Sequence, residues 1–207
     1  MSLRMHSTVG KSEQPDIVRV ITHSVVTPVG RIFLAATPDR LLRIELPGTN
    51  ADMRMNVWLA LRYPGAKIGR GVSPALRTAA AQLLEYFAGR RRAFDLPLLM
   101  TGTEFQRAVW KAVAAIPFAT CASYKEVACR VDRPGAVRAV GGAQAANPLP
   151  IVVPCHRVVG SDGSLTGYGG GLGLKQWLLE HERVKGRQPR RRHLKLAGTR
   201  PAAKLIS

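Results

Sequence analysis

A proline-braced segment ending at a cysteine constrains this chain more than any other feature of its sequence. Residues 147–159 contain Pro148, Pro150 and Pro154 around a β-branched run, and Cys155 follows the last proline directly. Each proline fixes its own φ and has no backbone N–H to donate, so the backbone here has few conformations available. The pattern predicts a braced, extended run that presents Cys155 at its end.

The neighbours of Cys155 make it a candidate nucleophile. The three cysteines, at positions 121, 129 and 155, lie 8 and 26 residues apart, which fits neither a disulfide framework nor a CxxC metal site. We therefore expect reduced thiols and chemistry from a single thiol. By itself, Cys155 fits a buried structural cysteine better than a nucleophile. His156 and Arg157 favour chemistry, because both can stabilise the thiolate, which is the nucleophilic form.

A third group is expected to orient the imidazole of His156. Adjacent residues on a strand point to opposite faces, so a direct Cys155–His156 pair requires a turn or a bridging water. Glu182 is the candidate for the orienting group, as the acid of a nucleophile–base–acid arrangement.

The charge of the chain predicts a polyanionic partner. Thirty-one Lys and Arg against thirteen Asp and Glu give a net charge of +18. Residues 183–207 hold nine of the basic residues and no acidic residue, so the rest of the chain carries 22 minus 13, or +9. A basic surface attracts polyanions, although charge alone does not separate DNA, RNA and membrane surfaces. The tail is typical of a solvated, disordered extension that adds only non-specific attraction to DNA.

Hydropathy argues against a membrane protein. At 207 residues the chain is long enough for one large domain or two small ones. It contains no apolar run of the roughly 20 residues that span a bilayer. The polar start, residues 1–15, lacks the apolar core of a secretory signal, so we expect an intracellular, cytoplasmic protein (nucleoid-associated if bacterial).

The first half of the chain predicts a small antiparallel sheet. Residues 17–26, 31–36 and 41–46 are rich in Val, Ile and Leu and indicate short strands. A tight turn is expected at residues 27–30, because Pro and Gly occupy it. Residues 1–16 are predicted to be a flexible N-terminus.

A helix is expected to follow this sheet. Ser73 and Pro74 are typical of a helix start, apolar residues follow at helical spacing, and Gly89 ends the pattern. Residues 90–97 are basic and then broken by proline, which indicates a boundary. Residues 17–98 therefore form a predicted α/β domain without obvious chemistry.

The second half predicts paired short helices. Residues 105–116 carry an apolar helical face, and Ser123 is placed to cap a helix that runs through Val131. Residues 132–134 break the helix, and residues 135–146 form a further helix of small side chains that can approach a backbone closely. Two such helices suit a nucleic-acid groove, although paired helices that bind nothing are also common. A closing helix is expected to end near Glu182, which gives a second domain over residues 99–182.

These motifs resemble one family. The O6-alkylguanine-DNA alkyltransferases, also called methylated-DNA–protein-cysteine methyltransferases, share the active-site string Pro154-Cys155-His156-Arg157-Val158. The resemblance covers residues 103–182 densely, and a weaker similarity at residues 27–30 extends it to the first domain. Further matching motifs, in the family's order and spacing, are Phe105-Gln106, Val109-Trp110, Ser123-Tyr124, Arg138-Ala139-Val140-Gly141, Asn147-Pro148, Gly167-Tyr168 and Gly170-Gly171-Leu172.

The resemblance implies a two-domain α/β (α+β) fold. The N-terminal domain would be a small antiparallel sheet with a helix, ribonuclease H-like, and the C-terminal domain a mainly helical, winged helix-turn-helix-like unit that carries the active-site cysteine. The basic tail, residues 183–207, lies outside the resemblance and is predicted to be disordered.

The resemblance also implies a single-turnover DNA repair reaction. Such a protein flips O6-alkylguanine, and O4-alkylthymine, out of duplex DNA, because the alkylated oxygen is unreachable inside the stack. It then transfers the alkyl group irreversibly to its own cysteine, with no metal or organic cofactor. We expect double-stranded DNA as the partner, no membrane contact, and a monomer, with cooperative binding to DNA left open.

Roles for individual residues follow from the same resemblance. Glu182 would orient His156, which would remove the proton of Cys155 through a water molecule. Tyr124 would assist extrusion and support the departing guanine, and Asn147 would pin the turn between the recognition helix and the active-site strand. The expected DNA-binding residues are Arg138, Tyr124, Lys125, Arg133 and Ser161, and the expected pocket residues are Pro150, Val158, Tyr168 and Gly169.

Arg138 is expected to fill the place that the flipped base leaves. The alternatives are an ordinary phosphate contact for Arg138 and a core position for Tyr124. Minor-groove reading by the helix-turn-helix is implied, and it predicts weak sequence preference.

The sequence departs from the family pattern in few places. Ala119 stands where a glycine is usual, which affects the turn before Ser123. With no cysteine before Cys121, the zinc site that some relatives hold in the first domain has no comparable cysteine set here. Two other functions stay open: a sensor that binds the lesion without transfer, and a multiple-turnover thiol hydrolase.

Overall fold

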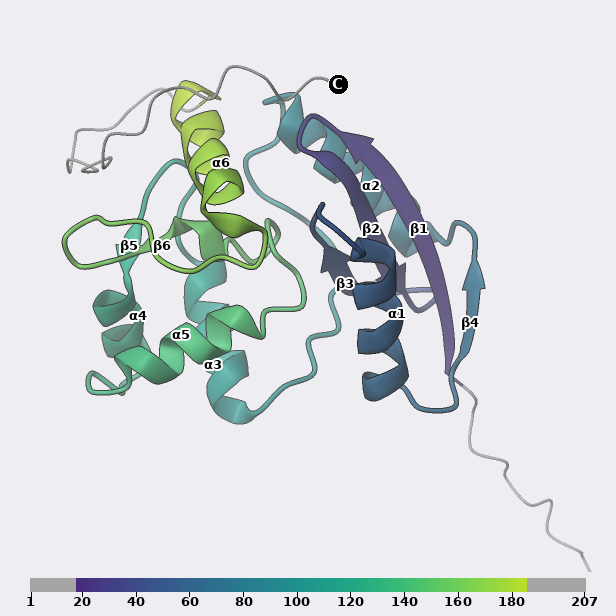
Figure 1. The fold of residues 1–207 in the computed structure, drawn as a ribbon, viewed down its shortest axis with the longest axis horizontal. Coiled ribbons are helices and arrows are strands. Elements are labelled where there is room, and N and C mark those ends of the chain that lie inside the picture. The colour runs from purple at the N-terminus through teal and green to yellow at the C-terminus, as the bar shows by residue number, and fades with distance from the viewer. Residues whose placement is uncertain (1–17, 186–207) are drawn as a thin grey trace, which may run out of the picture.

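The computed structural model describes residues 18–185, and it consists of two lobes (Figure 1). The predictions for residues 1–16 and for the tail beyond residue 185 lie outside the described residues. The first lobe is an α/β domain and the second is mainly helical, as the sequence predicts. None of the helices within residues 18–185 is long and apolar enough to cross a membrane.

The first lobe contains a four-stranded sheet in the order β3-β2-β1-β4. The three predicted strands and their antiparallel pairing are confirmed. The sequence did not predict β4, which pairs in parallel with β1, nor the helix α1 that precedes it. The elements are β1 (Arg19–Thr27), β2 (Gly30–Ala36), β3 (Leu41–Glu45), α1 (Ala51–Arg62), β4 (Lys67–Arg70) and α2 (Pro74–Phe87).

The turn between β1 and β2 depends on a glycine. The Thr27 hydroxyl donates to the carbonyl oxygen of Gly30 at 2.7 Å. Gly30 has a φ of 113°, and a Cβ at this position would lie 3.0 Å from the Cβ of Pro47. Only glycine adopts this backbone without strain, so the predicted tight turn has a conformational cause.

Two helices cover opposite faces of the sheet, because successive side chains of a strand alternate between faces. Ile32 and Leu34 of β2 belong to the apolar cluster that includes the α2 residues Leu76 and Leu83. Ala35, on the opposite face of the strand, belongs to the smaller cluster with the α1 residues Met55 and Leu59. The lobe therefore has three layers, and its α2 side faces the second lobe.

The predicted helix start at Ser73 and Pro74 is confirmed. Pro74 is the first residue of α2, and the Ser73 side chain accepts a hydrogen bond from the backbone N–H of Leu76. An N-cap hydroxyl satisfies one of the backbone donors that the first helical turn leaves free. The helix ends at Phe87, two residues before the predicted Gly89, which has a φ of 75°.

The second lobe is built from four helices and a short parallel pair of strands. The predicted helices are confirmed, with α5 beginning two residues later than expected and α6 continuing past Glu182 to residue 185. The elements are α3 (Glu104–Ala114), β5 (Ala122–Ser123), α4 (Tyr124–Arg130), α5 (Val137–Ala145), a 3-10 turn η1 (Cys155–Arg157), β6 (Val158–Val159) and α6 (Gly171–Lys185).

The break between α4 and α5 is at Asp132, as expected. Asp132 has a φ of 57°, a left-handed conformation that Asp tolerates better than most residues. Its N–H donates to the carbonyl of Cys129 at 3.0 Å, and this bond closes the end of α4.

The proline-braced segment is not a strand, which corrects the sequence-based prediction. Within it, Pro150 and Val153 form only an isolated bridge, and Cys155 opens the 3-10 turn η1. Ile151 has a φ of 75°, which is rare for a β-branched residue. The backbone therefore folds back on itself, and the first lobe holds it in place through a hydrogen bond from Ile44 N–H of β3 to the carbonyl of Pro148 at 2.9 Å.

Candidate active site

Cys155 lies almost completely buried at the start of η1, with 8% of its surface exposed. Its Sγ accepts a hydrogen bond from the Asn147 side-chain amide at 3.2 Å. The same amide nitrogen donates to the carbonyl of Val153 at 2.9 Å, and the Asn147 side-chain oxygen accepts from Leu149 N–H at 3.0 Å. Asn147 thus connects the end of the α5 segment to the folded-back loop and to the sulfur.

His156 and Glu182 form a buried pair beside this thiol. The imidazole Nε2 lies 2.8 Å from Glu182 Oε1, and both side chains are fully buried. Burial alone would raise the Glu182 pKa, but hydrogen bonds and positive charge from His156 and Arg157 outweigh burial and hold the pKa at about 2. Because the carboxylate is ionised, Nε2 carries the imidazole proton and Nδ1 keeps a free lone pair.

Nδ1 of His156 is the atom with which this pair can act as a base. It is buried and has no hydrogen-bond partner among residues 18–185. Burial lowers the His156 pKa, although the Glu182 carboxylate opposes that effect. A neutral imidazole that follows the thiol directly in the chain, with an unused acceptor, is suited to proton removal.

The hydrogen bonds of Arg157 go to Glu182 and to a backbone carbonyl and not to the thiol, which corrects the expectation that it stabilises the thiolate directly. Its Nε lies 2.9 Å from Glu182 Oε2, its Nη2 lies 2.9 Å from Oε1, and its Nη1 donates to the carbonyl of Ile116 at 2.6 Å. The fork of a guanidinium matches the two oxygens of a carboxylate, so Arg157 is committed to Glu182.

Lys175 is the cation that the sequence analysis missed. It is fully buried on α6, and its Nζ donates to the carbonyls of Val158 at 2.6 Å and Thr166 at 2.8 Å. Burial lowers its pKa to about 8, while nearby cysteine charge acts in the opposite direction. Both of its partners are backbone carbonyls, which every residue carries, so the sequence pattern does not indicate the role of this lysine.

The resting cysteine is a thiol rather than a thiolate. Burial raises the Cys155 pKa, and the Asn147 hydrogen bond and the Lys175 charge only partly offset this rise. The cysteine therefore depends on a base for activation, in contrast to a cysteine whose pKa is lowered by an adjacent cation.

Two further donors complete the surroundings of Glu182. The Tyr86 hydroxyl, from α2 of the first lobe, donates to Oε1 at 2.9 Å. The backbone N–H of Ala119 donates to Oε2 at 3.0 Å, and Ala119 has a φ of 60°. Ala119 therefore keeps the left-handed turn for which a glycine is usual, and the turn aims its N–H at the carboxylate.

The expected pocket residues surround the same loop. Pro150 and Val158 are buried, while Gly169 is exposed. The Tyr168 ring meets the His156 ring edge to face, with centroids 6.5 Å apart. The Tyr168 hydroxyl is buried without a hydrogen-bond partner in the part of the chain that the structure describes. Buried polar atoms are nearly always paired in proteins, so Tyr168 and His156 leave two positions for water or a bound molecule.

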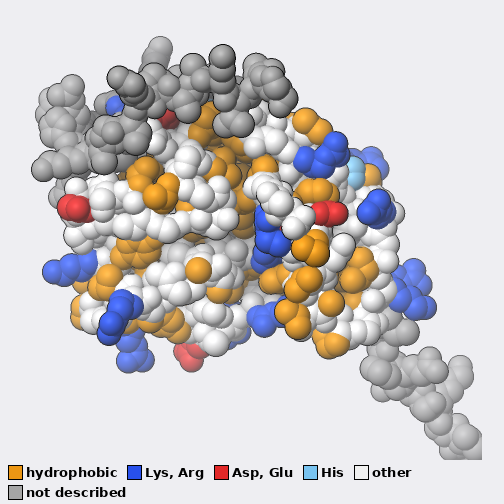
Figure 2. Space-filling model, in the orientation of Figure 1, with side chains coloured by type: hydrophobic (Ala, Val, Ile, Leu, Met, Phe, Trp, Pro, Cys, Tyr) orange, Lys and Arg blue, Asp and Glu red, His pale blue; other side chains and the backbone are white. Residues whose placement is uncertain are grey.

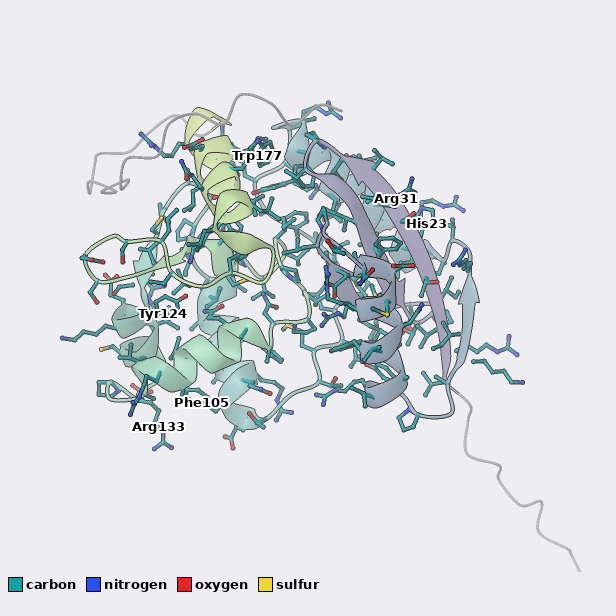
Figure 3. All side chains as sticks on the ribbon, in the orientation of Figure 1. His23, Arg31, Phe105, Tyr124, Arg133 and Trp177 are labelled. Atoms are coloured by element: carbon teal, nitrogen blue, oxygen red, sulfur yellow. The ribbon has the colours of Figure 1, made fainter. Side chains whose placement is uncertain are left out.

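The expected DNA-binding residues lie on the second lobe. Tyr124 begins α4 at partial burial, and its ring lies 5.9 Å from Lys175 Nζ, which links this helix to the site. Figure 3 shows Tyr124 on this lobe and Arg133 at the α4–α5 loop, where it points outward. The other members of the set are exposed: Lys125, Arg138 and Ser161.

The helix α5, the second helix of the predicted helix-turn-helix, has open space beside two of its glycines. A Cβ added at Gly141 or Gly142 would meet no atom within 4 Å, so the protein's own packing does not require these glycines. On the face in Figure 2, Lys and Arg side chains are spread around both lobes and few acidic side chains show. Such a surface favours a polyanion. In residues 18–185 no group of three or more His, Cys, Asp or Glu lies together as a metal site would require.

Both lobes match models of one protein family. Residues 104–184 match the model described as 6-O-methylguanine DNA methyltransferase, DNA binding domain. Residues 20–100 match the model of the ribonuclease-like domain of the same methyltransferase. The chain belongs to this family. The resemblance inferred from the motifs is thereby confirmed, and so is the two-domain fold class.

Named relatives agree over most of their length. The constitutive methylated-DNA–protein-cysteine methyltransferase of Bacillus subtilis is 42% identical over 159 residues, which cover 76% of this chain and 92% of that protein. The methylated-DNA–protein-cysteine methyltransferase of Mycolicibacterium paratuberculosis is 51% identical over 160 residues, 77% of this chain and 90% of that protein.

Solved structures of methyltransferases share this fold. A crystal structure of Mycobacterium tuberculosis O6-methylguanine methyltransferase superposes with a TM-score of 0.68 at 38% identity, covering 81% of this chain and 94% of that one. A crystal structure of the M. tuberculosis protein in complex with DNA gives the same TM-score at 37% identity, with the same coverage.

Proposed function

We propose that this methyltransferase-family protein repairs DNA by transferring the alkyl group of O6-alkylguanine to its own Cys155, once per molecule. The observation that carries the proposal is the buried thiol of Cys155 next to a His156–Glu182 pair whose Nδ1 has no partner among residues 18–185. A sensor that only binds the lesion would need neither a nucleophile nor a base.

The chemical step is a displacement at the alkyl carbon. His156 takes the proton of Cys155 through a water molecule, and the sulfur forms a bond to the carbon as the bond from that carbon to the guanine oxygen breaks. The guanine leaves with the electron pair and gains one proton, so the proton taken from the thiol is returned overall. Tyr124 supports the departing base with a hydrogen bond.

A thioether product explains why each molecule acts once. A His–Glu pair can activate water against an ester or thioester, as in a thiol hydrolase. A thioether has no carbonyl carbon for that water to attack. The alkylated sulfur is therefore the end of the reaction, which disfavours the multiple-turnover alternative.

DNA is the partner that the family assignment and the basic surface support, and alkylguanine in a duplex is the proposed substrate. We place Arg138 in the stack after the base is flipped, and O4-alkylthymine is a second expected substrate. We further propose a monomer that acts in the cytoplasm, where reducing conditions preserve the thiol. The proposed chemistry requires no cofactor.

Duplex DNA with a labelled O6-methylguanine tests the function. The expected result is one label per protein molecule, found by mass spectrometry on the peptide that contains Cys155. Cys155→Ala should carry no label, whereas Cys129→Ala, which removes an exposed thiol, should be labelled like the wild type. Label on the Cys155→Ala protein would refute the proposal. Tight binding to the modified duplex with unchanged protein mass would favour the sensor instead.

A further inference from the structure

The first lobe reaches the active site through a single hydroxyl group. Tyr86 lies on α2 and is fully buried, and its hydroxyl donates to Glu182 Oε1 at 2.9 Å across 96 residues of chain. The same oxygen lies 2.8 Å from His156 Nε2. A residue of the ribonuclease-like lobe is therefore two hydrogen bonds away from the imidazole.

The Tyr86 ring is surrounded by four other rings, which hold its hydroxyl toward Glu182. Phe87 and His181 lie with ring centroids 5.3 Å away, Phe94 at 5.6 Å and Phe118 at 6.3 Å. His181 Nε2 also lies 3.0 Å from the backbone carbonyl oxygen of Tyr86. Aromatic neighbours on several sides fix a ring more tightly than a single contact does, so the bond to Glu182 is a built feature of the interface between the lobes.

We propose that Tyr86 is a positioning residue for alkyl transfer, through which the first lobe fixes the orientation and basicity of the Glu182–His156 pair. This inference rests on the proposed function of Cys155. It assigns the ribonuclease-like lobe a part in the chemistry in addition to its structural role.

The physical reason lies in how many donors share one oxygen. Glu182 Oε1 accepts from Tyr86, His156 and Arg157. Each donor withdraws electron density from the carboxylate. Removing the phenol would leave more density for the bond to His156, which favours the protonated imidazole. It would also leave a lone pair of the buried Oε1 without a donor, and the carboxylate would be held less firmly.

The direction of the effect on the reaction follows. A base that holds a proton more tightly is protonated up to a higher pH, so the acid limb of the rate profile moves to higher pH. A looser carboxylate orients the imidazole less well, so the rate on the plateau falls. Packing alone would produce neither change, because Tyr86→Phe keeps the ring.

Single-turnover kinetics on methylated duplex DNA between pH 5 and 9 test the inference. Because each molecule reacts once, the amplitude reports the active fraction and the rate constant reports the chemistry. We expect Tyr86→Phe to keep the amplitude, to lower the plateau rate constant about 3- to 10-fold, and to move the acid limb upward by roughly half a pH unit.

Tyr63→Phe is the matched control. Tyr63 belongs to the same lobe, and its buried hydroxyl has no hydrogen-bond partner within residues 18–185. Its removal should change neither the rate constant nor the limb. A Tyr86→Phe profile that coincides with the wild type would overturn the inference, and so would an equal shift in Tyr63→Phe.

A folding defect is recognised separately. If Tyr86→Phe loses amplitude, Phe87→Leu serves as a second variant, because it loosens the same aromatic contacts and keeps the hydroxyl. Because these contacts hold the hydroxyl against Glu182, the inference predicts for Phe87→Leu an acid limb that moves in the same direction as in Tyr86→Phe but by less. A limb that stays at the wild-type position in both variants counts against it. A wild-type protein that transfers no label would instead refute the proposed function.

Discussion

Glu182 shows how a single buried carboxylate organises the site at the scale of one residue. Its two oxygens accept from Tyr86, Ala119, His156 and Arg157, which come from three separate parts of the chain. A buried charge is tolerated when its hydrogen-bonding capacity is filled, and it is costly when a partner is removed. The site therefore leaves the base little freedom: the carboxylate fixes both the tautomer and the plane of the imidazole.

Acid should destabilise the protein through this pair. The Glu182 pKa of about 2 lies below its usual 4.5, so its contribution to stability is complete above pH 4.5 and is lost as the pH falls toward 2. Its size is on the order of 3 kcal/mol. The lowered pKa of His156 acts in the same direction below its usual 6.5, because the unfolded chain takes up a proton that the folded chain refuses.

Urea unfolding measured from pH 7 downward checks this expectation. Glu182→Gln has no carboxyl group to protonate at this position, so its free energy of unfolding should fall less steeply between pH 4.5 and 2 than that of the wild type. Parallel curves for the two proteins across this window would show that the carboxylate pairing contributes little.

Ala119→Gly should stabilise the protein. Ala119 has a φ of 60°, a conformation that costs a residue with a Cβ about 1 to 2 kcal/mol. Glycine removes this cost but raises the entropy of the unfolded chain, so we expect a net gain of roughly 0.5 to 1 kcal/mol in the free energy of unfolding.

The control for this substitution is Ala115→Gly. Ala115 is the C-cap residue that follows α3, and its φ of −79° is one that alanine adopts without strain. Glycine there should cost stability, by about 0.5 to 1 kcal/mol. The opposite signs of the two changes are the test, and a loss at both positions would mean that Ala119 is not strained.

Residue-level prediction succeeded where chemistry is local and failed where partners are distant. Cys155, His156 and Asn147 lie close together in the chain, so a motif could indicate them together. Arg157 was expected at the thiol because it is near in the chain, but its guanidinium pairs with Glu182. Tyr86 contributes to the site from 96 residues away, and a helical pattern predicts only that such a tyrosine is buried.

At the scale of elements, side-chain caps accompany three of the predicted helices, α2, α3 and α4, whereas the missed helix has none. The helices α3 and α4 both begin with capping boxes, at Thr103 and Ser123, which are visible in the sequence. The missed helix, α1, begins after Asn50, which has a φ of 56° and makes no side-chain cap. Its apolar residues Met53, Val57 and Leu61 are exposed, so its pattern does not indicate a core-facing stripe.

The missed strand β4 has the same explanation. All four of its residues, Lys67–Arg70, are exposed, and it lies at the edge of the sheet. Strands are recognised in a sequence by an alternation that burial imposes. Where no face is buried, the pairing with β1 is decided by backbone hydrogen bonds that the side chains do not indicate.

The two capping boxes allow an element-scale test of DNA recognition. Ser123→Ala and Thr103→Ala each remove a hydroxyl that accepts a backbone N–H, and each should cost about 1 kcal/mol of stability. Because α4 begins at Tyr124, only Ser123→Ala should also weaken binding to methylated duplex DNA. DNA affinity is measured by fluorescence anisotropy. Equal affinities for the two variants would show that the Ser123 cap does not contribute to DNA binding.

At the scale of the whole molecule, hydrogen bonds join the two lobes around the loop that carries the thiol. The edge strand β3 bonds to the carbonyl of Pro148, and Tyr86 bonds to Glu182. The sequence predicted two domains and assigned all the chemistry to the second. It could not reveal these contacts, because each joins residues that are far apart in the chain and carry no complementary charge.

Deleting residues 186–207 should reduce non-specific DNA binding and leave the chemistry unchanged. The helix α6 continues through residue 185, so this cut keeps Glu182 inside the helix. The deletion removes seven Lys and Arg of the 31. Every phosphate that these side chains neutralise contributes about 0.9 to the slope of log affinity against log salt, so the slope should become shallower. An unchanged salt slope would show that the tail does not bind DNA, and the single-turnover rate at saturating DNA should match the full chain.

The confinement of Cys155 has a consequence for the protein after it has acted. Cys155 is only 8% exposed, and Asn147 donates a hydrogen bond to its sulfur at 3.2 Å. A methyl or larger substituent must occupy volume where this amide and the neighbouring loop now pack, and interiors accommodate added carbon atoms poorly. We therefore expect the alkylated protein to be less stable than the unreacted one. A molecule that has acted should unfold at a lower temperature, and a thermal melt should distinguish the two forms.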